Sequence, residues 1–216
     1  MIISSCRRHR QRWGRRRRPR RHARLRDLTA ILLLVAALPW TLPAVAVDWP
    51  AVGRVNITGL SFCTGTLIGP DRAVTAAHCL FHPRTGELAA LDDIHFVAGW
   101  DRGDFVAHAQ PTAVRIAVGY DWHRRRALAG LERDLAILEF AAPVAVPALA
   151  VQKNAEGSGA LAMVHYSHRR PHLADVAEGC VRLGLVGRLW QLDCAIEAGG
   201  SGAPVLIEEA DASGIA

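Results

Sequence analysis

A serine near the carboxyl end of the sequence lies in an unusually glycine-rich frame. Gly199, Gly200 and Gly202 surround Ser201 within the stretch CAIEAGGSGAP, residues 194–204. Glycines let a backbone turn sharply and bring its amides close to a substrate, at an entropic cost that an ordinary loop does not need to carry. The pattern therefore predicts a nucleophilic hydroxyl at Ser201.

A serine hydroxyl is a weak nucleophile at its own pKa, so this hypothesis requires a base and a group that orients the base. His78 lies in TAAHC, residues 75–79, and Asp134 begins the apolar run of RDLAILEF, residues 133–140. Taken singly, each has a structural interpretation: a serine in a turn, a histidine beside a cysteine, an aspartate that caps a strand. The three motifs together favour catalysis.

The order His78, Asp134, Ser201, with TAAHC, DLAIL and GxSGxP around them, resembles the trypsin-like serine peptidases. YSHRRPHL at 166–173, then Cys180 and DCAIEAGGSGAP, is similar to a bacterial branch that includes the glutamyl endopeptidases. The resemblance extends roughly over residues 49–206. The sequence departs from animal trypsins at two positions, where those enzymes have Asp and Gly: Gly200 and Ala203.

The resemblance implies a role for each residue. Ser201 is the acyl nucleophile, His78 takes its proton and returns it to the leaving amine, and Asp134 holds the imidazole tautomer. The backbone N–H groups of Gly199 and Ser201 form the oxyanion hole. The implied function is a serine endopeptidase acting on peptide or protein substrates, and the glutamyl branch implies acidic cleavage sites.

The chain contains short β-rich runs separated by Gly, Pro and Asp turn signals, which indicates an all-β antiparallel fold. With the resemblance, this becomes two β-barrels: residues 47–140 with His78 and Asp134, a proline-containing connector at 141–150, and residues 151–216 with Ser201. Only 15 residues follow Ser201. We therefore expect the second barrel to be truncated, which favours as the alternative a catalytically impaired or non-catalytic binding protein of the same fold.

The basic character of the sequence lies in its first 46 residues. They carry 12 Arg and one acid, so with a net charge of +6 for the whole chain the remainder carries −5, which removes the main support for nucleic-acid binding. An arginine tract, an apolar run and the small-residue site at 44–46 predict a secretory signal peptide. A retained signal anchor and a basic arm are the alternatives, and the export route stays open.

The cysteines support export to an oxidising compartment. Cys6 lies in the leader, and the other four form two local pairs that we expect to be disulfides, Cys63 with Cys79 and Cys180 with Cys194. Reduced cysteines or a metal site are the alternative, but neither pair has the short spacing of zinc ligands. We predict a secreted or periplasmic monomer that contacts a membrane only through an uncleaved leader.

Three histidines in one segment invite a metal hypothesis, but turn character and the absence of a nearby acidic ligand favour a solvated loop instead. We therefore predict no metal and no cofactor. The arginine run at 124–126 is also expected to be a solvated loop, and the tryptophans to be core or cleft-wall residues rather than a binding platform. The residues concerned are His165, His168 and His172 and, among the tryptophans, Trp100, Trp122 and Trp190.

Overall fold

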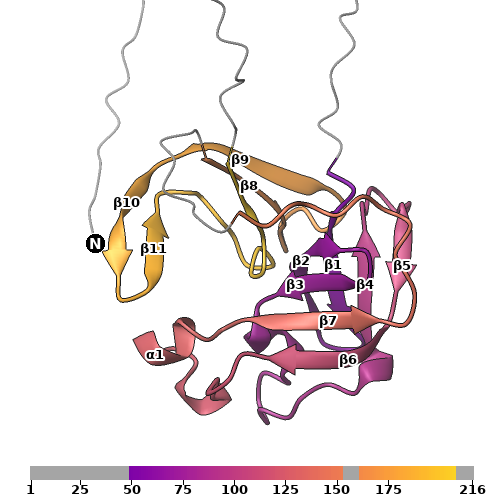
Figure 1. Cartoon of the computed structure of the whole chain (residues 1–216), viewed down its shortest axis with the longest axis horizontal. Helices are drawn as coiled ribbons and strands as arrows, with labels where there is room; N and C mark the ends of the chain where they lie inside the picture. The colour runs from indigo at the N-terminus through magenta and orange to yellow at the C-terminus, as the bar shows by residue number, and fades with distance from the viewer. Residues whose placement is uncertain (1–48, 153–160, 208–216) are drawn as a thin grey trace, which may run out of the picture. The chain divides into compact units, whose positions relative to one another are not determined.

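A computed structural model describes residues 49–152 and 161–207, and almost all of its regular structure is β (Figure 1). The predicted leader and the tail after Ile207 lie outside the described residues. Within them no helix is long and apolar enough to cross a membrane. The strands are β1 (Val52–Ile57), β2 (Ser61–Gly69), β3 (Arg72–Thr75), β4 (Ile94–Ala98), β5 (Ala107–Ala109), β6 (Pro111–Ile116), β7 (Ala136–Phe140), β8 (Leu161–Tyr166), β9 (Ala174–Cys180), β10 (Arg182–Val186), β11 (Leu189–Leu192) and β12 (Val205–Ile207).

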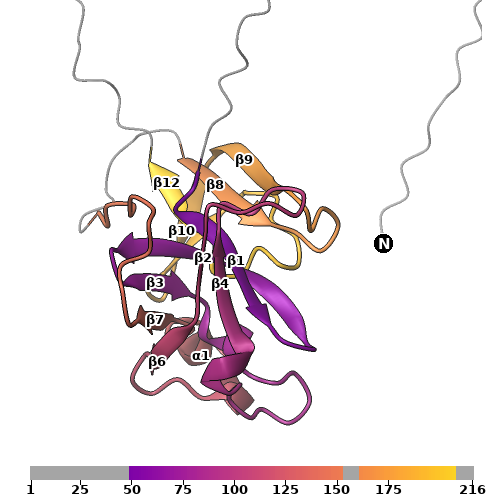
Figure 2. The same cartoon turned by 90° about the vertical axis from the view of Figure 1, so that its right-hand side faces the viewer.

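The first seven strands form one antiparallel sheet in the order β5-β4-β1-β2-β3-β7-β6, which curls around a core of aliphatic and aromatic side chains (Figures 1 and 2). Strand β7 illustrates how the sequence builds it: Ala136, Leu138 and Phe140 are buried, and the residues between them are less buried. That alternation places one face on the core. The turn after Gly69 joins β2 to β3.

The proline-containing connector packs on this first sheet. Val144 and Val146 are buried in its core, and the Val144 N–H donates to the Pro70 carbonyl oxygen at 2.7 Å. The Leu149 N–H donates to the Leu67 carbonyl at 2.9 Å. These hydrogen bonds fix the connector to the first sheet without making it a strand. The domain boundaries at 140 and 150 stay a prediction.

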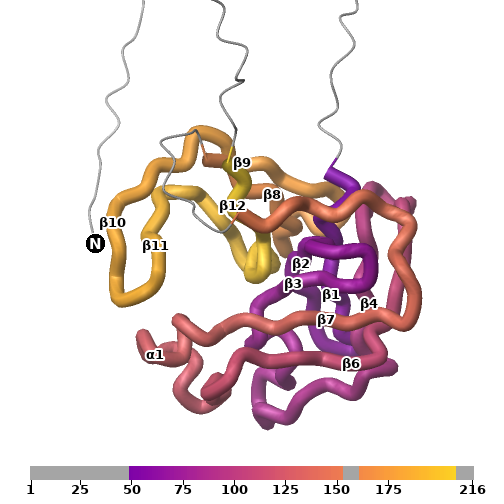
Figure 3. The backbone as a smooth tube through the Cα atoms, viewed as in Figure 1, coloured from indigo at the N-terminus to yellow at the C-terminus, as the bar shows by residue number. Residues whose placement is uncertain are grey.

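The second half contains a three-stranded sheet, β12-β8-β9, and the hairpin β10-β11 (Figure 3). Val164 and Tyr166 of β8 join Val52 of β1 in a second apolar cluster that connects the halves. The tip of the β10–β11 hairpin meets the residue after α1 (Leu128–Leu131), where the Arg188 N–H donates to the Glu132 carboxylate at 2.9 Å. The all-β prediction is confirmed.

Candidate active site

Strand pairing alone brings His78 and Asp134 together. Strands β3 and β7 are antiparallel, with Thr75 opposite Ala136. The chain continues past Thr75 into the 3₁₀ turn η1 (Ala77–Leu80), which carries His78, and Asp134 comes just before β7. Because the two strands run in opposite directions, the residues after β3 and those before β7 meet at the same edge of the sheet.

Asp134 binds two polar groups of His78, the backbone N–H and the ring Nδ1. One carboxylate oxygen of Asp134 accepts the His78 backbone N–H at 2.7 Å, and the other lies 2.5 Å from Nδ1 of the ring. A carboxylate has no proton to donate, so Nδ1 is the donor and Nε2 of the neutral ring is left as an acceptor. The Asp134 side chain is 13% exposed and that of His78 36%. The imidazole is therefore oriented on one side and open to solvent on the other.

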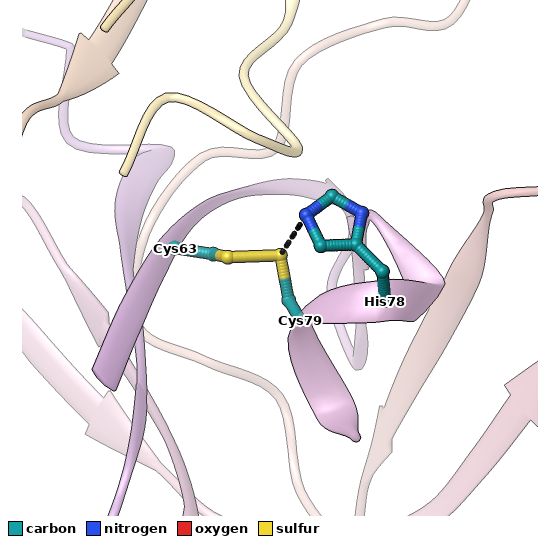
Figure 4. A group of neighbouring side chains, drawn as sticks. All are labelled: Cys63, His78 and Cys79. Carbon is teal, nitrogen blue, oxygen red and sulfur yellow. Dashed lines mark hydrogen bonds between the residues drawn. A yellow bond between two sulfur atoms is a disulfide. The ribbon is translucent and has the colours of Figure 1, made fainter. Parts of the chain in front are cut away.

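A disulfide fixes the turn that carries His78. Cys79 bonds to Cys63 of β2, as predicted, and the His78 ring lies against this bridge, with Nε2 3.7 Å from the Cys79 sulfur (Figure 4). Within the described residues these three form the only group of at least three His, Cys, Asp or Glu with potential metal-ligand atoms within 4.8 Å of one another. Because both sulfurs are oxidised, they offer no thiolate to a metal.

The glycines around Ser201 are required by their neighbours. Gly202 has φ +84°, and a Cβ there would lie 2.2 Å from the Thr64 carbonyl oxygen. Gly199 has φ +100°, and its Cβ would lie 2.7 Å from the Tyr166 carbonyl oxygen. Any other residue at either position would be strained by the positive φ, and its Cβ would clash with neighbouring backbone. The loop is thus pressed tightly between β2 and the end of β8.

Thr64 of β2 is the central anchor of this loop. Its backbone N–H donates to the Ser201 carbonyl at 2.9 Å, and its hydroxyl donates to the Gly199 carbonyl at 2.9 Å. The same hydroxyl accepts the Tyr166 N–H at 2.9 Å. Thr64 is fully buried. One side chain of the first sheet therefore positions both the proposed nucleophile's loop and a strand of the second half.

Replacing Thr64 with valine should destabilise the protein and slow any reaction at Ser201. Valine keeps the shape but leaves the Gly199 carbonyl and the Tyr166 N–H without this partner, at about 1–3 kcal/mol for each buried orphaned group. Urea unfolding measures the loss. Thr112→Val, at an exposed hydroxyl on β6, is the matched control and should change the free energy of unfolding by less than about 0.5 kcal/mol. Equal effects would show that Thr64 is not an anchor.

The loop presents free amides. Among the described residues, no acceptor pairs with the backbone N–H of Gly199 or of Ser201, whereas the N–H of Gly200 donates to the Glu197 carbonyl at 2.9 Å. No hydrogen bond joins Ser201 to the His78 ring in this part of the chain. The structure brings the two residues to the same end of β2 and β3 without closing that contact. Catalytic hydrogen bonds are often long in structures without substrate.

The second predicted disulfide is also present. Cys180 at the end of β9 bonds to Cys194, across 14 positions of sequence. This bridge encloses the β10–β11 hairpin and ends where the segment leading to Ser201 begins. The disulfide therefore joins the two ends of the hairpin. It also fixes Cys194, from which the chain continues to the glycine loop.

His165 corrects the sequence-based prediction. It belongs to β8 rather than to a solvated loop, and its residue is only 3% exposed. Its Nδ1 is buried without a partner, and a Cβ on Gly200 would lie 3.0 Å from its ring. Burial lowers the pKa of His165, against the charges of Asp175 and Glu197, which raise it. Strand β8 does not alternate, because Val164, His165 and Tyr166 are all buried, and the nearly continuous apolar run before His165 was the available signal of a strand buried on both faces.

Stability should therefore depend on pH through His165. The unfolded imidazole binds a proton below about pH 6.5, while the buried ring stays neutral to lower pH, so the free energy of unfolding should fall as pH drops through 6.5 toward the folded pKa. His165→Phe cannot titrate and should lose this part of the pH dependence. Urea unfolding of both proteins between pH 8 and pH 5 measures it, and parallel curves would contradict the prediction.

Tyr120 is a site residue that the sequence did not indicate. Its hydroxyl is buried without a partner, and burial together with the Asp134 charge raises its pKa to about 12. Its ring lies 5.6 Å from that of Phe81, which directly follows η1. Tyr120 is therefore close enough to feel the charge of the Asp134 carboxylate.

The remaining predicted residues do not converge on the site as ligands. His168 contacts the Phe62 carbonyl through Nε2 at 3.2 Å, and His172 uses its carbonyl to accept the Arg102 N–H at 2.7 Å. Trp100 packs in the second apolar cluster, as expected of a core residue. Trp190 is 50% exposed. The guanidinium group of Arg125 lies over the ring of Trp122, with its central carbon 3.7 Å from the ring centre.

The all-β architecture, with antiparallel sheets that curl into a half-barrel, is that of the trypsin-like fold. The profile of the trypsin-like peptidase domain matches residues 63–215, well over half of the chain. The chain therefore belongs to the trypsin-like peptidase domain family, whose members act on peptide or protein substrates.

Two comparisons agree with the family. A 70-residue stretch, 32% of this chain, is 33% identical to mannan-binding lectin serine protease 1 of Rattus norvegicus, and it spans 8% of that protein's length. The solved structure of a Glu endopeptidase in complex with MPD matches with a TM-score of 0.54 over 75% of each chain, at 17% sequence identity. At that identity the likeness shows the fold alone.

Proposed function

We propose that this chain is an exported serine endopeptidase that cleaves peptide bonds through Ser201, His78 and Asp134. The observation that carries the proposal is the double hold of Asp134 on His78, on the backbone N–H and on Nδ1. An aspartate that is simply exposed to solvent would not be expected to bind both the backbone N–H and the ring Nδ1 of the same histidine. The arrangement supports an imidazole whose Nε2 is free to accept a proton from a serine hydroxyl.

In the proposed reaction, Ser201 Oγ attacks the scissile carbonyl carbon while Nε2 of His78 takes the hydroxyl proton. The imidazolium then gives this proton to the leaving amine, the C–N bond breaks, and an acyl-enzyme ester remains. Water then attacks this ester with the help of the same imidazole, which releases the carboxylic acid product and restores Ser201. Asp134 keeps the ring oriented and stabilises its positive charge, and it does not itself become protonated.

The free amides of Gly199 and Ser201 support an oxyanion hole in this loop. Each donor of such a hole lowers the barrier by about 3–4 kcal/mol because it is already aimed at the position where negative charge develops. The tight fit of Gly199 and Gly202 against neighbouring backbone supports a loop that is preorganised. Preorganisation matters here, since a donor that must reorganise during the reaction loses much of its effect.

Two disulfides support an oxidising compartment outside the cytosol as the place of action. Together with the predicted leader, they favour secretion or export to a periplasm. The bridges tie the segments that lead to His78 and to Ser201, so reduction would loosen both sides of the proposed site.

A non-catalytic binding protein of the same fold is the second candidate, favoured by the absence of a hydrogen bond between Ser201 and His78 in the described residues. Labelling with a fluorophosphonate separates the two functions. The reagent needs an activated serine and an oxyanion hole but little substrate recognition. Covalent labelling at Ser201 supports the peptidase, and a folded protein that is not labelled supports the binding protein.

A further inference from the structure

Two histidines lie side by side on the edge of the first sheet, at the end of the strand order away from β3 and β7. Strand β5 pairs only with β4, and Val97 of β4 is opposite His108 of β5. His95 lies two positions before Val97 and therefore on the same face of the sheet. Nδ1 of His95 is 2.9 Å from Nε2 of His108, and the rings are within 20° of parallel.

The facing nitrogens share a single hydrogen between them. A neutral imidazole carries one N–H, so one of the two nitrogens donates and the other accepts. Neither nitrogen has another partner among the described residues.

The distance between these two nitrogens allows both of them to bind the same metal cation. Two imidazole nitrogens at about 2.0–2.1 Å from a metal, and at about a right angle to each other, are roughly 2.9 Å apart. Right-angled nitrogen ligands suit tetragonal or octahedral late first-row cations, and imidazole is a preferred ligand for them. The 2.9 Å between Nδ1 of His95 and Nε2 of His108 is a hydrogen-bond distance, and it is close to this right-angled separation, so a cation can take the place of the hydrogen with little movement of the rings.

We propose that His95 and His108 form a two-imidazole site for a divalent cation of this class, Ni²⁺ or Cu²⁺, bound through His95 Nδ1 and His108 Nε2. On binding, the hydrogen between the two rings moves to the remote nitrogen of the ring that carried it, so no net proton leaves two neutral rings. Water completes the coordination. Because the site lies on β4 and β5, it is independent of the proposed peptidase function.

Calorimetric titration of the full chain with Ni²⁺ tests the site. Wild type should bind, and His95→Ala and His108→Ala should each weaken binding by about tenfold or more, because the second ligand acts at the high effective concentration set by the first. His123→Ala, at an exposed histidine on η3 (Trp122–Arg124), is the matched control and should bind as wild type does. The double variant His95→Ala/His108→Ala gives the background from all other groups.

Circular dichroism of each variant shows whether the sheet is intact, and both histidines are on the surface side of their strands, where alanine leaves no core cavity. Unchanged Ni²⁺ affinity in either single variant would overturn the proposal. So would an equal loss in His123→Ala, which would show binding spread over surface histidines. Fluorophosphonate labelling should be the same in all four variants, so failure of the metal site and failure of the peptidase proposal remain distinct.

Discussion

Ser201→Ala, His78→Ala and the double variant should all show nearly the same residual peptidase activity, about a millionfold below wild type. Either replacement removes the activated nucleophile, so the second replacement has nothing left to remove. The measurement is peptide hydrolysis by the three variants and wild type at one pH. Fluorophosphonate labelling should be lost in both variants that lack Ser201 and nearly absent in His78→Ala.

The matched control is a serine outside the loop. Ser61→Ala, at the exposed start of β2, should keep wild-type activity and labelling. If the losses in the two single variants added up in the double variant, Ser201 and His78 would act separately. That result would remove the nucleophile and base assignment while leaving the fold untouched.

Asp134→Asn should reduce kcat/KM by about ten-thousandfold with little loss of structure. Asparagine offers one oxygen and one NH₂ group where the aspartate offers two acceptors, and both acceptors are in use, on the His78 N–H and on Nδ1. If the oxygen keeps the backbone N–H, the NH₂ group meets Nδ1. The ring must then carry its hydrogen on Nε2, where it can no longer accept one from Ser201.

A pair of variants separates this tautomer effect from a general loss of structure. Asp121→Asn makes the same chemical change at a carboxylate that accepts the His123 N–H and does not hydrogen-bond His78, and it should leave kcat/KM unchanged. Asp134→Asn should also keep wild-type circular dichroism. Activity within about tenfold of wild type in Asp134→Asn would contradict the proposed role of Asp134.

Much of the fold followed from local pattern. Short β-rich runs with Gly, Pro and Asp between them indicated strands, and the burial pattern of β7 is the alternation that such a run predicts. Local spacing also suggested both disulfides, which the structure contains. Strand β9 gives no such signal, because most of its side chains are exposed or half-buried and its sequence, ADVAEGC, shows no sustained apolar alternation.

The parts of the site that the sequence could not predict depend on distant partners. The Thr64 hydroxyl bonds groups 102 and 135 positions away, and a threonine in a β-rich run otherwise indicates only strand propensity. His165 was placed in a loop because charged neighbours follow it, whereas pairing with β9 buries it. The histidine, aspartate and serine motifs, by contrast, named the proposed catalytic residues from local sequence alone.

The pairing of β3 with β7 determines where the length of this chain can vary. His78 and Asp134 each lie within three positions of the Thr75–Ala136 pair, and a long excursion of the chain joins the two strands. An insertion in a part of this excursion away from Tyr120, such as the exposed turn at residues 83–85, therefore leaves the His78–Asp134 contact in place. A single residue added between Thr75 and His78 would instead rotate the imidazole away from its carboxylate. Loop grafting that aims to alter substrate preference can therefore change the length of the exposed part of the excursion, but not the length of the segment between Thr75 and His78.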